Sequence, residues 1–481
     1  MISLGKLLLR SLFYYWKSHL LVSLGAAIST MVLTGALIIG DSVKTSLLTT
    51  AQLRLGRTDF VFQGIDRFFR SELAHEVQND LKTDVAPVLH VTGVASSQGG
   101  VMKLPDINVW GIDEQFSKMT GHDTWQSIPG RNEVFISTNL ASRLQLKTGD
   151  PVLLRLEKAS PLPKNAPFVS ETDNRISIRL TVKQILSPEQ LGQFNLRASQ
   201  TAPFNAFVSQ SALNELMGTG NLANLLLFAS SKKVDIPSIM RSVREHWTMQ
   251  DAGLSIKAVN NGKQWELKSE RVFIEPVVVE AVKKLEPEPD LLLTYFANAF
   301  NKDTLSTPYS FISAGSFINN HADNPGNELL INEWLAEDLQ ARPGDSIRMD
   351  YFVMAPLRRL EEKSIWLRVK DVVPMTNPYD ESLMPSIPGL TDAGNCRDWE
   401  TGIPIDLDKI REKDESYWNE WKGTPKAFIN YQLGKKLWEN RFGVSTAIRL
   451  SAEKYTRESI EKYLGSALNP SEFGFGVDAV E

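Results

Sequence analysis

The sequence has few of the residues that disulfides, metal sites and nucleic-acid interfaces need. One cysteine in 481 residues excludes an internal disulfide and any site built from several thiolates. The six histidines are scattered, and none falls in an HExxH or His-x3-His pattern. There is no basic surplus either, because 52 Lys and Arg stand against 57 Asp and Glu, for a net charge of -5. A nucleic-acid partner is therefore not expected.

The motifs of common enzyme classes are also missing. The chain contains no GxSxG nucleophile elbow, no GxxxxGK[ST] phosphate loop and no GxGxxG turn. We therefore expect no catalytic residue, no bound metal and no cofactor, and we expect that this chain does not hydrolyse ATP itself.

Long apolar runs are absent with one exception, which lies near the N-terminus. Residues Leu20 to Gly40 carry no charge, and as a helix they would span about 30 Å, the thickness of a bilayer's hydrocarbon core. A buried core helix and a cleaved signal peptide are the alternatives, but both usually have shorter apolar runs. The sequence predicts a transmembrane helix over 20–41.

Charges on either side of this run predict its orientation. Lys6, Arg10 and Lys17 precede it, and Asp41 follows it. By the positive-inside rule, the N-terminus is cytoplasmic and the remainder of the chain is an ectodomain. Apolar and aromatic side chains recur at helical spacing over 1–19, which predicts an amphipathic helix on the cytoplasmic leaflet.

The predicted span is rich in small residues. Gly25, Ser29 and Gly35 are the ones that we single out as helix-packing positions, because small side chains let two helices approach closely in lipid. The alternative is an anchor that is merely rich in alanine and glycine.

An internal repeat organises the ectodomain. Residues 132–150 and 327–345 are identical at nine of 19 positions with a constant offset of 195. Each copy reads as a strand, a helix, a Gly-Asp turn and another strand, so both Gly-Asp pairs are interpreted as structural. We predict an α+β fold with one repeat over 42–262 and a second over 263–481.

The second repeat contains an insertion over 374–423. It holds the candidate partner-binding residues Asp398, Trp399, Glu400 and Trp418, since a long insertion on one copy is a reasonable place for a specific contact. Asp398 and Glu400, with the nearby Asp392, also leave open a weak calcium site, a hydrolytic carboxylate pair or a plain solvated loop.

Two segments carry a resemblance to a known family. GALIIGDSVKTSL over 35–47 and LGRTDFV over 55–61 resemble the start of the FtsX-like (MacB-like) permease subunits of bacterial ABC transporters. The 132–150 segment is similar to the MacB-like periplasmic core domain of that family. The resemblance implies a bacterial inner-membrane protein with a periplasmic or extracellular ectodomain. It also implies a cytoplasmic ATP-binding subunit as partner, and a second permease or a periplasmic adaptor as further partners beside the lipid bilayer.

The sequence departs from the family in its number of spans. Family members have at least four, whereas this chain has one predicted span, so we expect the N-terminal part of a longer permease, by truncation or gene splitting. The leading function is a permease subunit that couples a partner's ATPase cycle to the ectodomain. A single-pass membrane-anchored scaffold or regulatory binding protein is the alternative, and an anchored hydrolase is a third. The transported substrate stays open.

Overall fold

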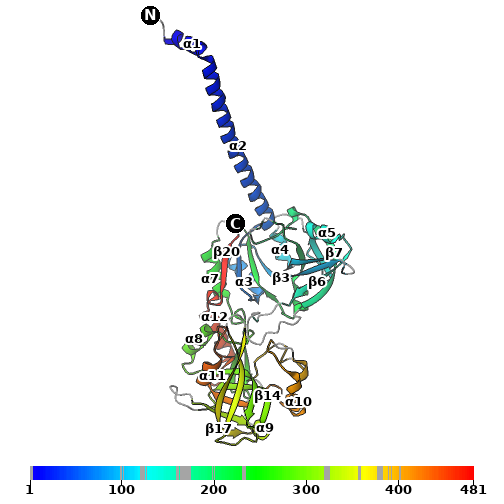
Figure 1. Ribbon diagram of the computed structural model, residues 1–481, viewed down its shortest axis with the longest axis vertical. Helices are drawn as coiled ribbons and strands as arrows, with labels where there is room; N and C mark the ends of the chain where they lie inside the picture. Colours follow the sequence, from blue (N-terminus) through cyan, green and yellow to red (C-terminus); the bar gives the residue numbers. More distant parts are fainter. Residues whose placement is uncertain are drawn as a thin grey trace.

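A long helical stalk and a two-lobed ectodomain make up the computed structural model of the chain (Figure 1). The structure describes residues 4–97, 100, 102–119, 125, 127–158, 162, 175–197, 199, 201–229, 234–318, 326–355, 359–375, 383–387, 389–391, 393–399 and 402–480.

The stalk consists of α1 (Leu4–Tyr14) and α2 (Trp16–Leu55). Helix α2 is continuous over 40 residues, so it extends well beyond the predicted span. It is the one helix in the described part of the chain that is long and apolar enough to cross a membrane. Its threonine hydroxyls donate to carbonyls one turn earlier, as Thr30 does to Ala26 at 2.8 Å, which satisfies them without water.

The ectodomain is built twice, and we call Thr58–Val259 copy one and Gln264–Ala479 copy two. The strands of copy one are β1 (Thr58–Gly64), β2 (Phe69–Arg70), β3 (Val85–Ser97), β4 (Lys103–Ile112), β5 (Glu133–Ser137), β6 (Pro151–Glu157), β7 (Arg175–Leu186), β8 (Asn205–Ser209), β9 (Leu222–Ala223), β10 (Leu225–Ala229) and β11 (Leu254–Val259). Its helices are α3 (Glu72–Leu81), α4 (Glu114–Lys118), α5 (Thr138–Leu144), α6 (Gln210–Met217) and α7 (Ile236–His246), with a 3-10 turn at Pro188–Gln190.

Copy two repeats this order. Its strands are β12 (Gln264–Ser269), β13 (Asp290–Lys302), β14 (Leu305–Gly315), β15 (Glu328–Asn332), β16 (Ser346–Met354), β17 (Leu360–Val373), β18 (Ala427–Asn430), β19 (Ala447–Ser451) and β20 (Phe475–Ala479). Its helices are α8 (Pro276–Leu285), α9 (Glu333–Asp338), α10 (Glu412–Trp421), α11 (Tyr431–Trp438) and α12 (Arg457–Ala467), with 3-10 turns at Cys396–Asp398, Leu407–Lys409 and Pro470–Phe473.

Each copy contains a closed six-stranded barrel. In copy one the strand order is β3-β4-β8-β5-β7-β6, and β6 pairs back to β3. In copy two the order is β13-β14-β18-β15-β17-β16, and β16 pairs back to β13. Closure leaves no free edge within either ring. The interior of the copy one barrel is filled by aliphatic side chains from every strand of the ring.

Each barrel grows out of a four-stranded antiparallel layer. In copy one the layer has the order β20-β1-β10-β3 and includes α3 and α7, and in copy two it has the order β11-β12-β19-β13 and includes α8 and α12. This is the βαββαβ arrangement of ferredoxin-like folds, with strand order 4-1-3-2. The long strands β3 and β13 belong to both layer and barrel, so layer and barrel are continuous within each copy.

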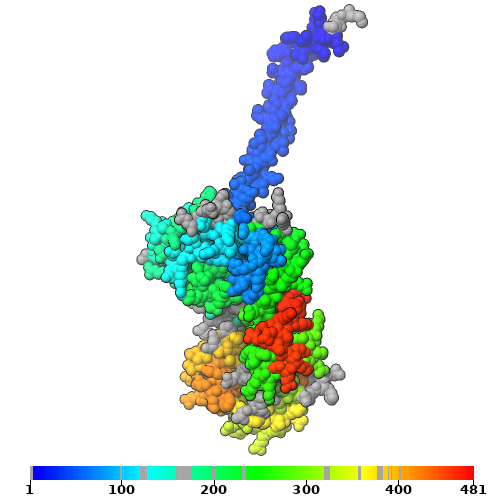
Figure 2. All heavy atoms as spheres, turned by 180° about the vertical axis from the view of Figure 1, so that it is seen from behind, coloured from blue at the N-terminus to red at the C-terminus, as the bar shows by residue number. Residues whose placement is uncertain are grey.

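The fourth strand of each layer comes from the other copy. Strand β11 follows α7 of copy one but pairs with β12 of copy two. Strand β20 follows α12 of copy two but pairs with β1 of copy one. One buried cluster therefore contains apolar residues of both layers. In Figure 2 the C-terminal residues, coloured red, lie across the junction of the two lobes. The predicted α+β ectodomain with a duplicated fold is confirmed.

Candidate coupling site at the foot of the membrane helix

Helix α2 is fixed to copy one by backbone hydrogen bonds at its C-terminal end. The Arg57 amide donates to the Met119 carbonyl at 2.9 Å, and the Asn195 amide donates to the Arg54 carbonyl at 3.3 Å. The Arg54 guanidinium donates to the Ser199 carbonyl. These bonds come from two separate loops, so the foot of the helix is held on two sides.

A glycine makes this close attachment possible. Gly56 ends α2 with a φ of 59°, a left-handed conformation that non-glycine residues adopt at a cost. A Cβ at this position would lie 2.5 Å from the Met119 carbonyl oxygen. Gly56 is therefore required both for the turn and for the approach of the helix end to the ectodomain.

The predicted helix-packing residues lie on the free part of α2. Gly25 and Ser29 are exposed and Gly35 is half-buried, and a Cβ added at either glycine would meet no atom within 4 Å. Gly25 and Ser29 lie about one turn apart, so they share a face. Their packing role stays a prediction, because the structure contains no second membrane helix among the described residues.

The predicted partner-binding residues of the insertion do not share one environment. Asp398 is exposed and accepts a hydrogen bond from the Asn395 side chain at 3.2 Å. Trp399 and Trp418 are only 8% and 3% exposed, and their rings meet edge to face at 5.1 Å. Their rings thus fill the interior of copy two, and their role in binding a partner stays a prediction. Glu400, like the nearby Asp392, lies outside the described residues.

Sequence reasoning missed a buried lysine beneath the insertion. The Lys426 ammonium lies 3.8 Å from the centre of the Trp334 ring, 4.6 Å from that of Tyr417 and 3.7 Å from Asp414 Oδ1. Burial lowers the pKa of Lys426 to about 8, although the charge of Asp414 acts in the opposite direction. The signal in the sequence was a lysine directly before a mostly apolar strand.

A carboxylate on α9 ties the insertion to the barrel. Asp338 accepts hydrogen bonds from Thr307 Oγ1 at 2.5 Å, from Arg411 Nη2 at 2.7 Å and from Lys413. Burial raises the pKa of Asp338, but these three bonds outweigh it and hold the pKa below its ordinary value. The N-terminal end of α10 is therefore anchored by charge as well as by packing.

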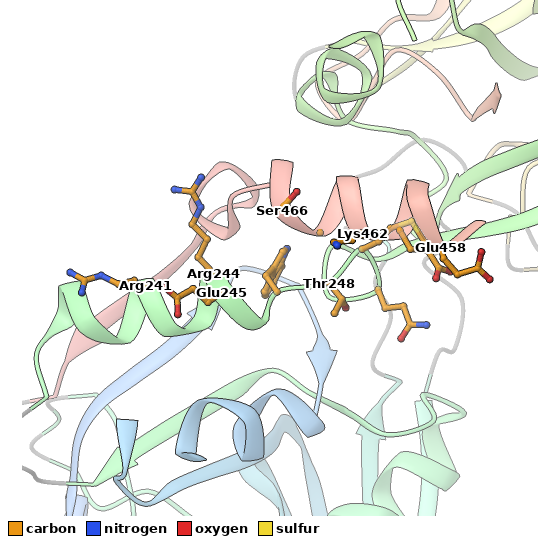
Figure 3. Close-up of a pocket in the computed structure, with 12 residues that line it drawn as sticks. Arg241, Arg244, Glu245, Thr248, Glu458, Lys462 and Ser466 are labelled. Carbon is orange, nitrogen blue, oxygen red and sulfur yellow. The ribbon is translucent and has the colours of Figure 1, made fainter. Parts of the chain in front are cut away.

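An open groove lies between α7 and α12, where the copies meet (Figure 3). It has a volume of about 870 Å³. Arg244 and Glu245 project from α7, and Lys462 and Glu458 project from α12, so both acidic and basic side chains line it. In the described residues, no group of three or more His, Cys, Asp or Glu side chains is placed to hold a metal.

Comparisons with known proteins give structural neighbours only. No family model and no curated protein sequence matches the chain. The periplasmic region of MacB from Actinobacillus actinomycetemcomitans is 14% identical, with 42% of this chain and 86% of that chain covered and a TM-score of 0.26. The extracellular domain of the noncanonic ABC-type transporter YknZ from Gram-positive bacteria is 14% identical, with 39% and 91% covered and a TM-score of 0.26.

Both neighbours are domains that lie outside the membrane. One of them belongs to MacB, which gives its name to the MacB-like family that the N-terminal sequence of this chain resembles. At 14% identity and a TM-score of 0.26, the likeness does not extend to a function. The function has to be argued from the residues of this chain.

Proposed function

We propose that this chain is a permease-like subunit of an ABC transporter, which passes movement between a cytoplasmic ATP-binding partner and the ectodomain. The observation that carries the proposal is the unbroken course of α2 from the apolar segment to its attachment at Gly56. The N-terminus is cytoplasmic in this proposal, and the ectodomain lies outside a bacterial inner membrane.

The part of α2 beyond the apolar segment is suited to transmit force. Between Asp41 and Leu55 it contains neither glycine nor proline, the residues at which helices most often kink. A displacement of the helix in the membrane would therefore reach the loops of Met119 and Asn195 without being absorbed on the way. A flexible tether would suffice if the helix were only an anchor.

The energy source would be a partner. The chain has no phosphate-binding loop, and the small residues of α2 are suited to pack against further membrane helices. The ectodomain would engage a substrate or a periplasmic adaptor on its outer side.

Purification of the full chain from its own cells in mild detergent tests the partnership. We expect an ATP-binding subunit to co-purify, with vanadate-sensitive ATPase activity. Gly25→Leu with Gly35→Leu should reduce its recovery while membrane insertion persists, and Ile28→Leu with Val32→Leu, on the same helix, is the matched control. An ATPase-free preparation of the wild type from cells that express the neighbouring genes would contradict the proposal and favour a single-pass scaffold.

A second experiment tests the rigid connection itself. Ser46→Gly with Thr49→Gly softens α2 outside the apolar segment, and Ser46→Ala with Thr49→Ala is the control. We expect nucleotide-dependent changes in hydrogen exchange of copy one in the control and their loss in the glycine variant. Equal responses in both variants would contradict coupling through α2 but leave the partnership standing.

A further inference from the structure

The strand exchange between the two copies has a specific side chain at its centre. Phe475, the first residue of β20, inserts into a slot of aromatic rings on copy one. It stacks on Phe62 at 5.3 Å between ring centres, meets Trp247 edge to face at 5.1 Å and lies 6.0 Å from Phe69. Such pairs contribute beyond the area that they bury.

A glycine opens this slot. Gly64, the last residue of β1, lies directly opposite Phe475 in the sheet. A Cβ on Gly64 would lie 2.6 Å from a carbon of the Phe475 ring, closer than real contacts allow. Its backbone is not in the left-handed region, so the ring and not the backbone conformation requires glycine here.

The equivalent position in copy two is built differently. Ser269, the last residue of β12, lies opposite Leu254, the first residue of β11. Here a residue with a Cβ faces a smaller aliphatic side chain. Gly64 with Phe475 and Ser269 with Leu254 are thus two distinct matched pairs at the same place in the two layers.

We propose that the edge of β1 is a strand-binding site that selects β20 through Phe475, and that this selection interlocks the two copies. If each copy kept its own fourth strand, Leu254 would face Gly64 and leave the aromatic slot underfilled. The Phe475 ring would then face the Cβ of Ser269. The exchanged pairing is the arrangement in which both positions fit.

Hydrogen bonds and an ion pair hold the segments that cross between the copies in the positions that the exchanged pairing needs. Asp251, in the segment that leads from α7 to β11, is fully buried and accepts hydrogen bonds from Arg70 Nη2 and from the Thr248 amide, both at 2.9 Å. Arg67 of copy one forms an ion pair with Glu275 of copy two. After β20, the Val480 amide donates to the Asp59 carbonyl at 2.8 Å, so copy two ends beside the foot of α2.

The interlock follows from the ectodomain geometry and does not depend on the transport proposal. If the chain is a permease, however, the same contact carries any movement of β1 directly into α12 and copy two. Failure of the ATPase experiments would leave the interlock untouched.

A double-mutant cycle in the full chain tests the selection. Gly64→Ala should lower the thermal midpoint and raise hydrogen exchange in β1 and β20, because its Cβ collides with the ring. Phe475→Leu should restore part of this loss in the Gly64→Ala background while it destabilises the wild type. Gly476→Ala is the matched control, since its Cβ would meet nothing within 4 Å. Additive effects of the two substitutions would overturn the role of the ring.

Disulfide trapping tests the exchange itself. Ser255 lies opposite Lys268 in the exchanged pairing, and it would lie opposite Gln63 if copy one kept its own strand. We expect Ser255→Cys with Lys268→Cys to crosslink within one chain, and Ser255→Cys with Gln63→Cys to stay reduced. The reverse pattern, or crosslinks mainly between two chains, would overturn the interlock.

Discussion

Strand β8 of copy one and the equivalent strand β18 of copy two differ in the buried polar residue at their N-terminal end. In copy one it is Asn205, which is neutral and fully buried. Its side-chain amide donates to the Gly192 and Phe194 carbonyls at 3.1 and 2.8 Å and accepts from Trp110 Nε1 at 3.1 Å. In copy two the aligned residue is Lys426, which carries a positive charge between two aromatic rings.

The insertion explains this difference. Asp414 and Tyr417, which contact the lysine, both belong to α10, whereas the described residues between β7 and β8 of copy one form a 3-10 turn but no α-helix. A buried charge needs a partner, whereas a buried amide can be satisfied by nearby carbonyls. The insertion is therefore part of the core of copy two, and its loss would leave a buried charge without its carboxylate.

Removing the carboxylate of Asp338 should have the largest effect. Asp338→Ala removes the acceptor of Lys413 and Thr307 and one of the two carboxylates that Arg411 contacts, and we expect a loss of about 3 kcal/mol in the unfolding free energy. Hydrogen exchange should rise in α10 and β18 and stay unchanged in the copy one barrel. The measurement is denaturant unfolding of the purified full chain together with exchange mass spectrometry.

Copy one supplies the matched control for this change. Arg143 takes the place of Asp338 at the repeat offset and is exposed on α5. Arg143→Ala should change the unfolding free energy by no more than about 0.5 kcal/mol. Equal losses for both substitutions would contradict the anchoring of the insertion by Asp338.

The pH dependence of stability should also separate the copies. Lys426 has a folded-state pKa of about 8, below that of a free lysine, so the unfolded state binds more protons between these two values. Stability of copy two should therefore rise with pH from about 8 to about 10, by at most roughly 1.4 kcal/mol per pH unit. In Lys426→Met this rise should be absent. Its persistence in the variant would assign it to another group.

Another group near Lys426 also titrates in this pH range, so the unfolding free energy of wild type has to be compared with that of Lys426→Met at each pH. Burial raises the pKa of the Cys396 thiol to about 12, so this group alone would make stability fall with increasing pH. Because the Lys426 charge lowers the pKa of this thiol, the contribution of Cys396 differs between the two proteins, and the comparison is therefore made in a Cys396→Ser background.

Sequence patterns predicted the repeat well because each copy has the same periodic core positions and the same Gly-Asp turn. The membrane segment was predictable from its uncharged length. The strand exchange was not, because β11 and β20 have the same pattern whichever layer receives them, and the choice depends on contacts with distant residues such as Gly64. The burial of Trp418 was not predictable for a related reason, since a charged helix gives no sign of which of its aromatic residues is buried.

Alanine in place of the glycine of each Gly-Asp turn should lower the unfolding free energy equally in both copies. Gly149 and Gly344 have φ values of 94° and 99°, and a Cβ at either would meet nothing within 4 Å. Alanine at each position should therefore cost only the backbone strain, about 1 to 2 kcal/mol, with exchange rising locally in β6 or β16. Unequal losses of unfolding free energy at the two positions would show that one turn has a role besides leading the chain into β6 or β16.

The smallest effect should come from a surface ion pair that both copies share. Lys183 Nζ lies 2.7 Å from Glu133 Oε2, and in copy two the equivalent Lys370 and Glu328 atoms lie 2.9 Å apart. All four side chains are more than a third exposed, so alanine at either glutamate should cost less than about 1 kcal/mol, and less still in high salt.

Of these two glutamate substitutions, Glu133→Ala should lower the unfolding free energy more than Glu328→Ala. Glu133 also accepts a hydrogen bond from the Gly130 amide at 2.8 Å, and the bonds from Lys183 and Gly130 together hold its pKa below the ordinary value. Because the backbone bond is not an ion pair, the difference between the two substitutions should survive in 0.5 M salt (about a 4 Å screening length) while the shared part fades. If high salt abolished the difference between the two substitutions, that difference would be due to charge alone.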